Sequence, residues 1–507
     1  MFRQYCKADL DYCNPVLVNE YDLMKPTSRI LKNTLLSFGT NVSAKLANVI
    51  GFIFISRAAG VANAGVFSLA TIYLLILSSL LIGLDELITR QVARLPGQSR
   101  GYFLLFMTLR LVLSIGLYFC LIVLIFGLNY PQQISNVFIL IGLCLIPDGI
   151  SNTSQAVLSA FESYGVSFGA AIFSGVVRVV GIVWLLNNGK GILEVALVWL
   201  ISSVIVAFIV LMAALRHKSQ SGPIDDTAGS VHIQELWLSV PFILTSFFTT
   251  MEYQVDVILI SKLLGNEMVG LYSSITTIIF SLALIPQAFR SAVYPYMIRK
   301  YEQAPLAILK IFQASSTILS VVAFPIIFGL SLLSERVIEL VYGTSFLPAA
   351  PALGLIGFVL VFFFLNIPSS RILLIYNKQN LLPGLWAVCL GVNIGLNLLL
   401  LPSLGLIGAA IARIASESIF FFTAQIISTR LIGYKNGGRE LLPAFLAALA
   451  MSAVVYPIRS QPIWLPVTAG IIIYPIFLLL ALSFFDQERM VLAEIGGVIF
   501  RAILRQE

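Results

Sequence analysis

The stretch ISRAAGVANAGVFSLATIY (residues 55–73) returns 205 positions later as ISKLLGNEMVGLYSSITTI (residues 260–278). Six positions are identical at this constant offset, and Arg57 is matched by Lys262. Each copy begins where one apolar segment ends and continues into the next. A repeat of this kind predicts two equivalent halves, and transporters built from such halves bind their substrates at the boundary between them.

The composition is that of a membrane protein. Of the 507 residues, 59% are hydrophobic and 11% are charged, whereas a soluble protein carries about 25% charged residues. Apolar segments long enough to cross about 30 Å of hydrocarbon recur along the chain, and helices are expected because a helix satisfies its own backbone in lipid. The fourteen predicted spans are 34–56, 65–84, 102–127, 135–158, 166–186, 192–214, 236–261, 269–294, 311–333, 347–374, 381–401, 405–429, 441–457 and 463–485.

The predicted fold class is therefore an all-α integral membrane protein with about 14 transmembrane helices. Six spans separate the two copies of the repeat, so both halves cross the membrane in the same sense. This predicts two pseudo-symmetric six-helix lobes plus two C-terminal helices. The predicted divisions are a cytoplasmic tail (1–33), an N-lobe of spans 1–6 (34–214), an interlobe loop (215–235), a C-lobe of spans 7–12 (236–430), spans 13–14 (441–485) and a cytoplasmic tail (486–507).

The basic residues of the loops predict the orientation. Twenty of the 31 Lys and Arg residues fall on one predicted side and five on the other. Because the cytoplasmic side carries the excess of positive charge, both termini are expected in the cytoplasm of a cell whose inner or plasma membrane holds the protein. The net charge of +7 then reflects topology, and no nucleic-acid partner is expected.

Polar residues follow one face of the first helix of each predicted lobe. On span 1 the face carries Thr34, Ser37, Asn41, Lys45 and Asn48; on span 7 it carries Thr245, Thr249, Glu252 and Asp256. These groups would be costly against lipid, so we expect them to face the bundle interior or a hydrated cavity. Polar contacts between helices are the alternative interpretation.

The other intramembrane charges are few. Asp148 lies in span 4, Arg178 in span 5, and Arg413 and Glu417 are four residues apart in span 12, close enough to pair. Arg110, Arg290 and Arg371 lie nearer the cytoplasmic ends and are interpreted as interface anchors. We expect the same of Arg57 and Lys262 at the outer ends, with a functional role as the alternative.

Signals for enzyme chemistry are nearly absent. The two histidines, His217 and His232, fall in the interlobe loop without a ligand set, and the five cysteines follow no metal or disulfide spacing. No phosphate-binding loop is present, so direct use of ATP is not expected. The prediction is a protein that is not an enzyme, with no metal and no bound cofactor, and with a H⁺ or Na⁺ gradient as the candidate energy source.

The chain resembles the polysaccharide or O-antigen flippases of the multidrug/oligosaccharidyl-lipid/polysaccharide exporter superfamily. Besides the first repeat, the stretches that carry this resemblance are SVPFILTSFFTTMEYQVDVILISKLLGNEMVGLYSS (239–274), ERVIELVYGTSFLPAAPAL (335–353) and LNLLLLPSLGLIGAAIARIASE (396–417). It implies two six-helix lobes around a cavity that opens to alternate sides. It also implies a lipid-linked oligosaccharide substrate moved from the cytoplasmic to the outer leaflet. From the span 7 pattern, only Asp256 is assigned a functional role.

A mechanism follows as a hypothesis. The substrate head group is an anionic pyrophosphate with sugars, which cannot cross hydrocarbon unaided. We expect Lys45, Arg178 and Arg413, with Asn41 and Asn48, to replace water around it in a central cavity. The expected ion-coupling residues are Glu252, Asp256 and Asp148. Membrane lipids, and a glycan polymerase or glycosyltransferases, are the candidate partners.

Two other functions stay open. A cation-coupled small-molecule or drug antiporter of the multidrug exporter branch has the same fold, although Lys45 stands in span 1 where that branch places an acidic residue. A membrane-bound glycan polymerase or sugar transferase would need sizeable outer loops, and those predicted here are short.

Overall fold

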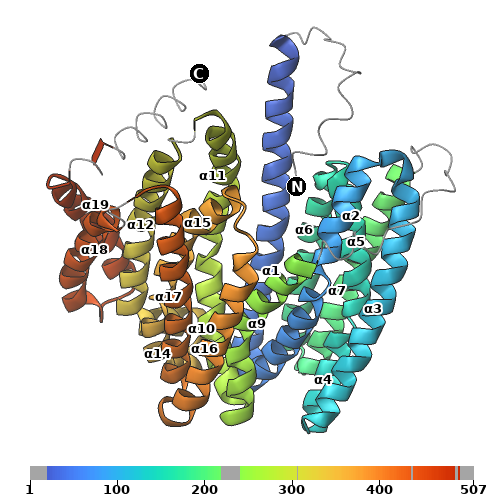
Figure 1. Ribbon diagram of the computed structural model, residues 1–507. Helices are drawn as coiled ribbons and strands as arrows, with labels where there is room; N and C mark the ends of the chain where they lie inside the picture. Colours follow the sequence, from blue (N-terminus) through green and yellow to red (C-terminus); the bar gives the residue numbers. More distant parts are fainter. Residues whose placement is uncertain (1–19, 219–239, 305–306, 435–437, 486–488, 491–507) are drawn as a thin grey trace.

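The chain folds as a bundle of helices. The computed structural model of the protein describes residues 20–218, 240–304, 307–434, 438–485 and 489–490, and its elements in these ranges are α- and 3₁₀-helices (Figure 1). The helices of the first half are α1 (Glu20–Ser79), α2 (Ile82–Arg94), η2 (Pro96–Gln98), α3 (Ser99–Gly127), α4 (Gln132–Gly142), α5 (Leu145–Ala160), α6 (Tyr164–Asn187) and α7 (Ile192–Lys218).

The second half repeats this plan and adds two helices. Its helices are α9 (Val240–Leu263), α10 (Asn266–Leu282), α11 (Leu284–Gln303), α12 (Ala307–Leu332), α13 (Ser334–Tyr342), η3 (Thr344–Ala349), α14 (Ala350–Ile356), α15 (Val359–Ile375), α16 (Leu381–Leu404), α17 (Leu406–Leu431), η4 (Arg439–Leu441), α18 (Leu442–Val455), η5 (Tyr456–Ile458) and α19 (Trp464–Leu482).

Each predicted span has a matching helix or helix pair. Twelve helices of the described residues are long and apolar enough to cross a membrane. One of them, Leu35–Ser79, is bent at Gly60 and accounts for the first two predicted spans. The pair Thr344–Ile356 and Val359–Ile375, bent by 41°, accounts for the tenth. The protein is therefore an all-helical, multi-pass membrane protein, as predicted.

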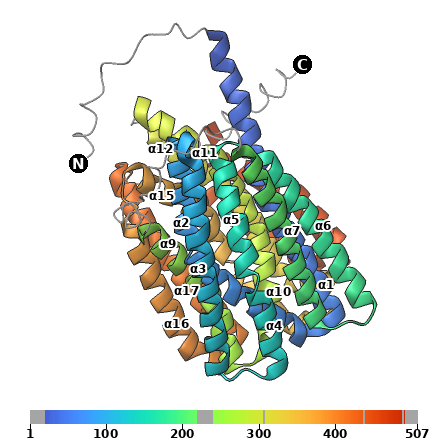
Figure 2. The same cartoon turned by 90° about the vertical axis from the view of Figure 1, so that its right-hand side faces the viewer.

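The two halves stand side by side as lobes. Figure 1 shows α2–α7 on one side of α1 and α10–α17 on the other, and Figure 2 gives the view from the side of the first lobe. Helices α18 and α19 pack together and against α12, at the edge of the second lobe. Met451 of α18 and Tyr474 of α19 are buried there with Phe324 of α12. The last two spans therefore lie away from the boundary between the lobes.

Helix α1 begins at Glu20, within the predicted N-terminal tail (1–33), and its apolar, span-length part begins at Leu35. The rest of that tail and nearly all of the interlobe loop lie outside the described residues, as does the C-terminal tail apart from residues 489–490.

Both copies of the repeat turn at the same glycine. Gly60 has φ 82° and ψ 174°, and Gly265, its equivalent in the repeat, has φ 90° and ψ 176°. A side chain is strained at such positive φ, so glycine is required at both turns. The sequence repeat is thus also a conformational repeat, and each turn joins the first and second helices of its lobe.

The two copies also pack against each other. A Cβ atom on Gly65 would overlap the backbone carbonyl of Asn266, and a Cβ on Gly270 would overlap that of Val61. These two contacts exchange under the 205-residue offset, as expected for a pseudo-two-fold axis between the copies. Between them the hydroxyl of Ser68 donates a hydrogen bond to Ser273 Oγ at 2.6 Å. The glycines permit the close approach that this contact needs.

The matched cations Arg57 and Lys262 bind across the boundary in a reciprocal manner. The Arg57 guanidinium of the first lobe donates to the carbonyls of Leu340 and Val341 at the end of α13 in the second. The Lys262 ammonium of the second lobe donates to the Leu128 carbonyl after α3 in the first, at 3.0 Å. Both cations therefore bind the partially negative C-terminal end of a helix. We call these two contacts and the Ser68–Ser273 pair the cross-lobe clamp.

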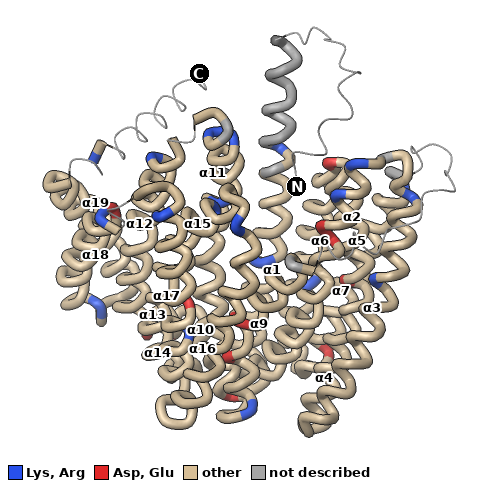
Figure 3. The backbone as a smooth tube through the Cα atoms, in the orientation of Figure 1, with Lys and Arg blue, Asp and Glu red and all other residues tan. Residues whose placement is uncertain are grey.

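The charged residues are unevenly spread along the bundle. Figure 3 shows Lys and Arg gathered mainly toward the end at which α1 begins. The cross-lobe clamp lies beside the turns at Gly60 and Gly265, which follow the first span of each lobe. Lys and Arg are thus more frequent at one end of the bundle than at the other, and the predicted orientation, with both termini in the cytoplasm, rests on such an excess.

Candidate functional site

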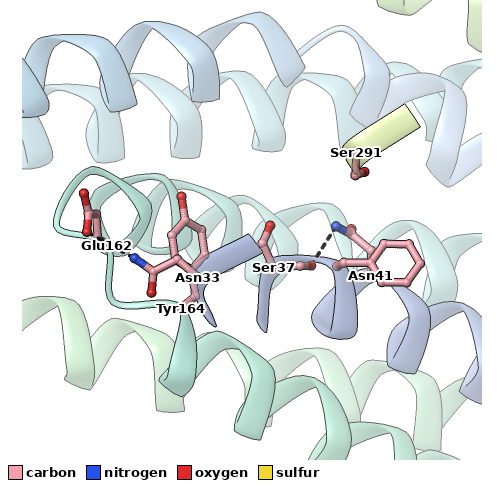
Figure 4. A pocket seen from close by; sticks show the side chains of 7 residues that line it. Asn33, Ser37, Asn41, Glu162, Tyr164 and Ser291 are labelled. Atoms are coloured by element: carbon pink, nitrogen blue, oxygen red, sulfur yellow. Dashed lines mark hydrogen bonds between the residues drawn. The ribbon is translucent and has the colours of Figure 1, made fainter. Parts of the chain in front are cut away.

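A cavity of about 350 Å³ opens between the lobes toward the end where α1 begins. Its lining residues come from α1, from the turn before α6 and the first residue of that helix, and from α11: Asn33, Ser37, Phe38, Asn41, Glu162, Tyr164 and Ser291. Figure 4 shows Ser291 across the cavity from Ser37 and Asn41. The lining is thus mainly amide, hydroxyl and aromatic, and it includes the carboxylate of Glu162, which accepts a hydrogen bond from Asn33 at 3.1 Å. The volume of the cavity falls in the range of small-molecule sites.

The row of polar residues on α1 leads from this cavity deeper into the protein. Lys45 lies one helical turn beyond Asn41 on the same face of α1, about 6 Å further along the axis. Its ammonium donates a hydrogen bond to Gln287 Oε1 on α11 at 3.1 Å, across the boundary between the lobes. Gln287 stands one turn before Ser291, so the two facing helices contribute successive polar layers.

Arg178 lies within the N-lobe and is held by several groups. Its Nη1 donates to Asn48 Oδ1 at 2.6 Å and its Nε to Ser202 Oγ at 3.0 Å. Its guanidinium carbon lies 3.8 Å from the ring centroid of Trp199, a cation–π geometry. Asp148 is within electrostatic reach of it. Arg178 thus ties α1, α6 and α7 together, and it uses Asn48 to do so.

Arg413 lies in a buried cluster inside the C-lobe. Its guanidinium binds Glu252 Oε2 at 2.8 Å and Asp256 Oδ2 at 2.6 Å, and the side chains of these three residues are 3%, 0% and 0% exposed. Further donors complete the cluster: Ser416 to Glu252 at 2.7 Å, Asn397 to Asp256 at 3.1 Å and Tyr272 to Asp256 at 2.5 Å. The cluster joins α9, α10, α16 and α17.

The sequence suggested Glu417 as the partner of Arg413, but in the structure Arg413 binds other carboxylates. Arg413 binds the two carboxylates of α9, whereas both carboxylate oxygens of Glu417 are buried and accept no hydrogen bond. A helical spacing of four residues brings two side chains to one face, but it does not decide which neighbouring helix lies opposite them. The cluster therefore holds three carboxylates around one guanidinium.

The predicted substrate-binding residues are thus divided among three places. Asn41 lines the cavity and Lys45 lies beyond it, Asn48 and Arg178 hold each other in the N-lobe, and Arg413 is enclosed with Glu252 and Asp256 in the C-lobe. Gln287 and Ser291 were missed, because uncharged residues of one helix carry no sequence signal that distinguishes them. No cluster of three or more potential metal-ligating side chains occurs in the part of the chain that the structure describes.

Two relatives match part of the sequence. The chain is 30% identical over 129 residues to the teichuronic acid biosynthesis protein of Bacillus subtilis, which is 25% of this chain and 26% of that protein. It is 22% identical over 208 residues to the probable low-salt glycan biosynthesis flippase of Haloferax volcanii, covering 40% and 44% respectively. The matches thus span about a quarter and under half of these relatives.

Solved structures share the fold over most of the chain. The lipid II flippase MurJ in an inward closed conformation superposes with a TM-score of 0.66 at 15% identity, covering 89% of this chain and 99% of that one. An outward-facing multidrug resistance MATE family transporter of the MOP superfamily gives 0.61 at 14% identity, covering 80% and 96%. In addition, the family model described as polysaccharide biosynthesis protein matches residues 65–351, more than half of the 507 residues. The chain therefore belongs to the polysaccharide biosynthesis protein family.

Proposed function

We propose that this protein is a flippase for an isoprenoid-pyrophosphate-linked oligosaccharide, such as a repeat unit of O-antigen, capsule or exopolysaccharide. The observation that carries the proposal is the polar cavity between two lobes whose opposite ends are joined by the cross-lobe clamp. Membership of the family, and the partial similarity to a probable glycan biosynthesis flippase, support a glycan substrate.

The proposed transport step is a rocking of the two lobes. The cavity is lined by residues of the first part of α1, toward the end that carries most Lys and Arg, and the charge distribution assigns that end to the cytoplasm. The hydrated head group would enter the cavity while its isoprenoid chain stays in lipid. Opening of the clamp and closure around Lys45 would then expose the head group on the outer side of the cell membrane.

A deletion strain tests this function. Because a flippase acts between synthesis and polymerisation of the glycan, its loss is expected to deplete surface glycan and to leave lipid-linked oligosaccharide on the inner leaflet. The measurement is extraction of the lipid-linked intermediate together with surface-glycan staining, with the wild-type gene restored as the control. Normal surface glycan without accumulation would contradict the proposal, whereas loss of drug resistance instead would favour an antiporter.

The cluster around Arg413 argues against the antiporter. Glu252 and Asp256 are the carboxylates that would bind a cationic substrate in the C-lobe, and Arg413 already occupies them. The similarity to MATE transporters shows a shared fold alone.

We propose that a H⁺ or Na⁺ gradient drives the cycle. In the C-lobe cluster the Glu417 carboxylate accepts no hydrogen bond, so it can take up a proton while Arg413 stays bound to Glu252 and Asp256, and Asp148 is a second candidate in the N-lobe. In vesicles containing the purified protein, an ionophore that collapses the driving gradient is expected to slow flipping at least about tenfold. A flipping rate that stays unchanged when the H⁺ gradient is collapsed, and also when the Na⁺ gradient is collapsed, would contradict ion coupling.

A further inference from the structure

The turn between α5 and α6 contains an unexpected residue. Helix α5 ends at Ala160, and two residues later Glu162 has φ 56°. The N–H of Ser163 donates a hydrogen bond to the Leu158 carbonyl at 2.8 Å. The N–H of Glu162 donates to the Ser159 carbonyl at 3.0 Å, which completes a Schellman motif. In this motif the residue with positive φ is usually glycine and sometimes asparagine, because other side chains are strained there.

Helices α6, α15 and α17 end in the same motif and follow this rule. Two residues after their ends stand Gly189, Asn377 and Gly433, with φ values of 68°, 56° and 69°. Among the described residues, Glu162 is the one with positive φ that is neither glycine nor asparagine. Glycine would suit the turn better, so the reason for a glutamate lies in its side chain, and strain of this kind is typical of functional positions.

That side chain belongs to the cavity between the lobes. Glu162 is exposed and lines the cavity, and its Oε2 accepts a hydrogen bond from Asn33 Nδ2 on α1 at 3.1 Å. Figure 4 shows this pair at one end of the lining, beside Tyr164. Helices α1 and α6 pack tightly nearby, since a Cβ on Gly39 would come within 2.8 Å of the Phe168 ring. The carboxylate is thus held on a wall that these two helices form.

The rest of the lining suits a carbohydrate. The hydroxyl groups of Ser37 and Ser291 can donate and accept hydrogen bonds, and the amide of Asn41 does both. The ring of Tyr164 offers a face for the C–H groups of a sugar. An ionised Glu162 differs from these groups because it accepts hydrogen bonds only. It can bind hydroxyl or amine groups of a sugar, whereas a carboxylate on the sugar offers it no donor and adds repulsion between like charges.

We infer that Glu162 is a specificity-determining residue, which selects a head group with a neutral or amine-bearing sugar at this position and excludes an acidic sugar such as a uronate. The inference rests on the proposed flippase function and narrows its substrate class. Specificity is a difference between two affinities. A carboxylate on the cavity wall contributes to both, because it binds the hydroxyl groups of one sugar and opposes the carboxylate of the other.

Binding of two synthetic conjugates to the purified full-length protein in lipid nanodiscs tests the inference. Both contain geranylgeranyl pyrophosphate; one bears glucose and the other glucuronate, so they differ only at C6 of the sugar. We expect the wild-type protein to bind the glucose conjugate at least about tenfold more tightly than the glucuronate conjugate. Glu162→Gln keeps the size of the side chain and adds a donor, so it should raise glucuronate affinity and reduce this ratio below about threefold.

Glu162→Gly separates binding from folding. Glycine relieves the strain of the turn, so this variant should unfold at the same temperature as wild type or at a higher one. Its affinity for the glucose conjugate should fall at least about tenfold, because the acceptor is lost. Asn377→Gly is the matched control, since it makes the same change after α15, at a residue that does not line the cavity. It should change either affinity less than about twofold.

Two results would overturn the role of Glu162 and leave the flippase proposal standing. One is wild-type protein that binds both conjugates equally; the other is Glu162→Gln protein with the wild-type ratio of affinities. Wild-type protein that binds neither conjugate would also overturn the inference, and the deletion strain then decides separately whether the protein is a flippase.

Discussion

Replacement of Arg413 by leucine is expected to destabilise the C-lobe by about 3–5 kcal/mol, the usual cost of removing one partner from a buried ion pair. The substitution leaves Glu252 and Asp256 buried without their guanidinium, and these side chains are 0% exposed. The measurement is the thermal unfolding of purified protein in detergent, with the amount of folded protein in the membrane as a second readout.

Arg290→Leu is the matched control for this prediction. It removes the same side chain from the same half of the protein, at a position without a described carboxylate partner, and is expected to leave stability unchanged or slightly higher. A contrary result would be Arg413→Leu protein as stable as wild type but unable to support glycan export. That outcome would return Arg413 to the substrate-binding role that the sequence suggested.

A disulfide between positions 68 and 273 is expected to stop transport. The two serine hydroxyl oxygens are 2.6 Å apart across the pseudo-two-fold axis, so Ser68→Cys combined with Ser273→Cys places two thiols close enough to bond. Oxidation would hold the cross-lobe clamp closed and prevent the outward-open state. Surface-glycan output should fall at least about tenfold and recover on reduction, because the reduced thiols leave the lobes free to separate.

The single variants Ser68→Cys and Ser273→Cys control for the substitutions themselves, and Cys120→Ser removes from the background the native thiol that is exposed among the described residues. Formation of the bond is measured by a reduction-dependent mass shift of a proteolytic fragment that joins the two segments. Full transport with the bond formed would show that the clamp does not open during the cycle, and the rocking of the lobes would have to be abandoned.

The repeat shows how far sequence reasoning could reach. Gly60 and Gly265 were paired by their offset alone, and the structure gives them the same backbone conformation. What the offset could not reveal is that the two copies contact each other, as Gly65 and Gly270 do with Asn266 and Val61. Arg57 and Lys262, interpreted as interface anchors with function as the alternative, bind helix ends of the opposite lobe instead of standing alone at the membrane surface.

The sequence by itself determined the membrane class, the spans and the two equivalent halves, because each of these follows from hydrophobicity and periodicity along a continuous stretch of chain. The tertiary structure alone decided which charges are neutralised. Arg413 meets Glu252 across 161 residues and Lys45 meets Gln287 across 242. Helical spacing indicates which face of a helix a side chain occupies, but only the packing of distant segments brings a partner to that face.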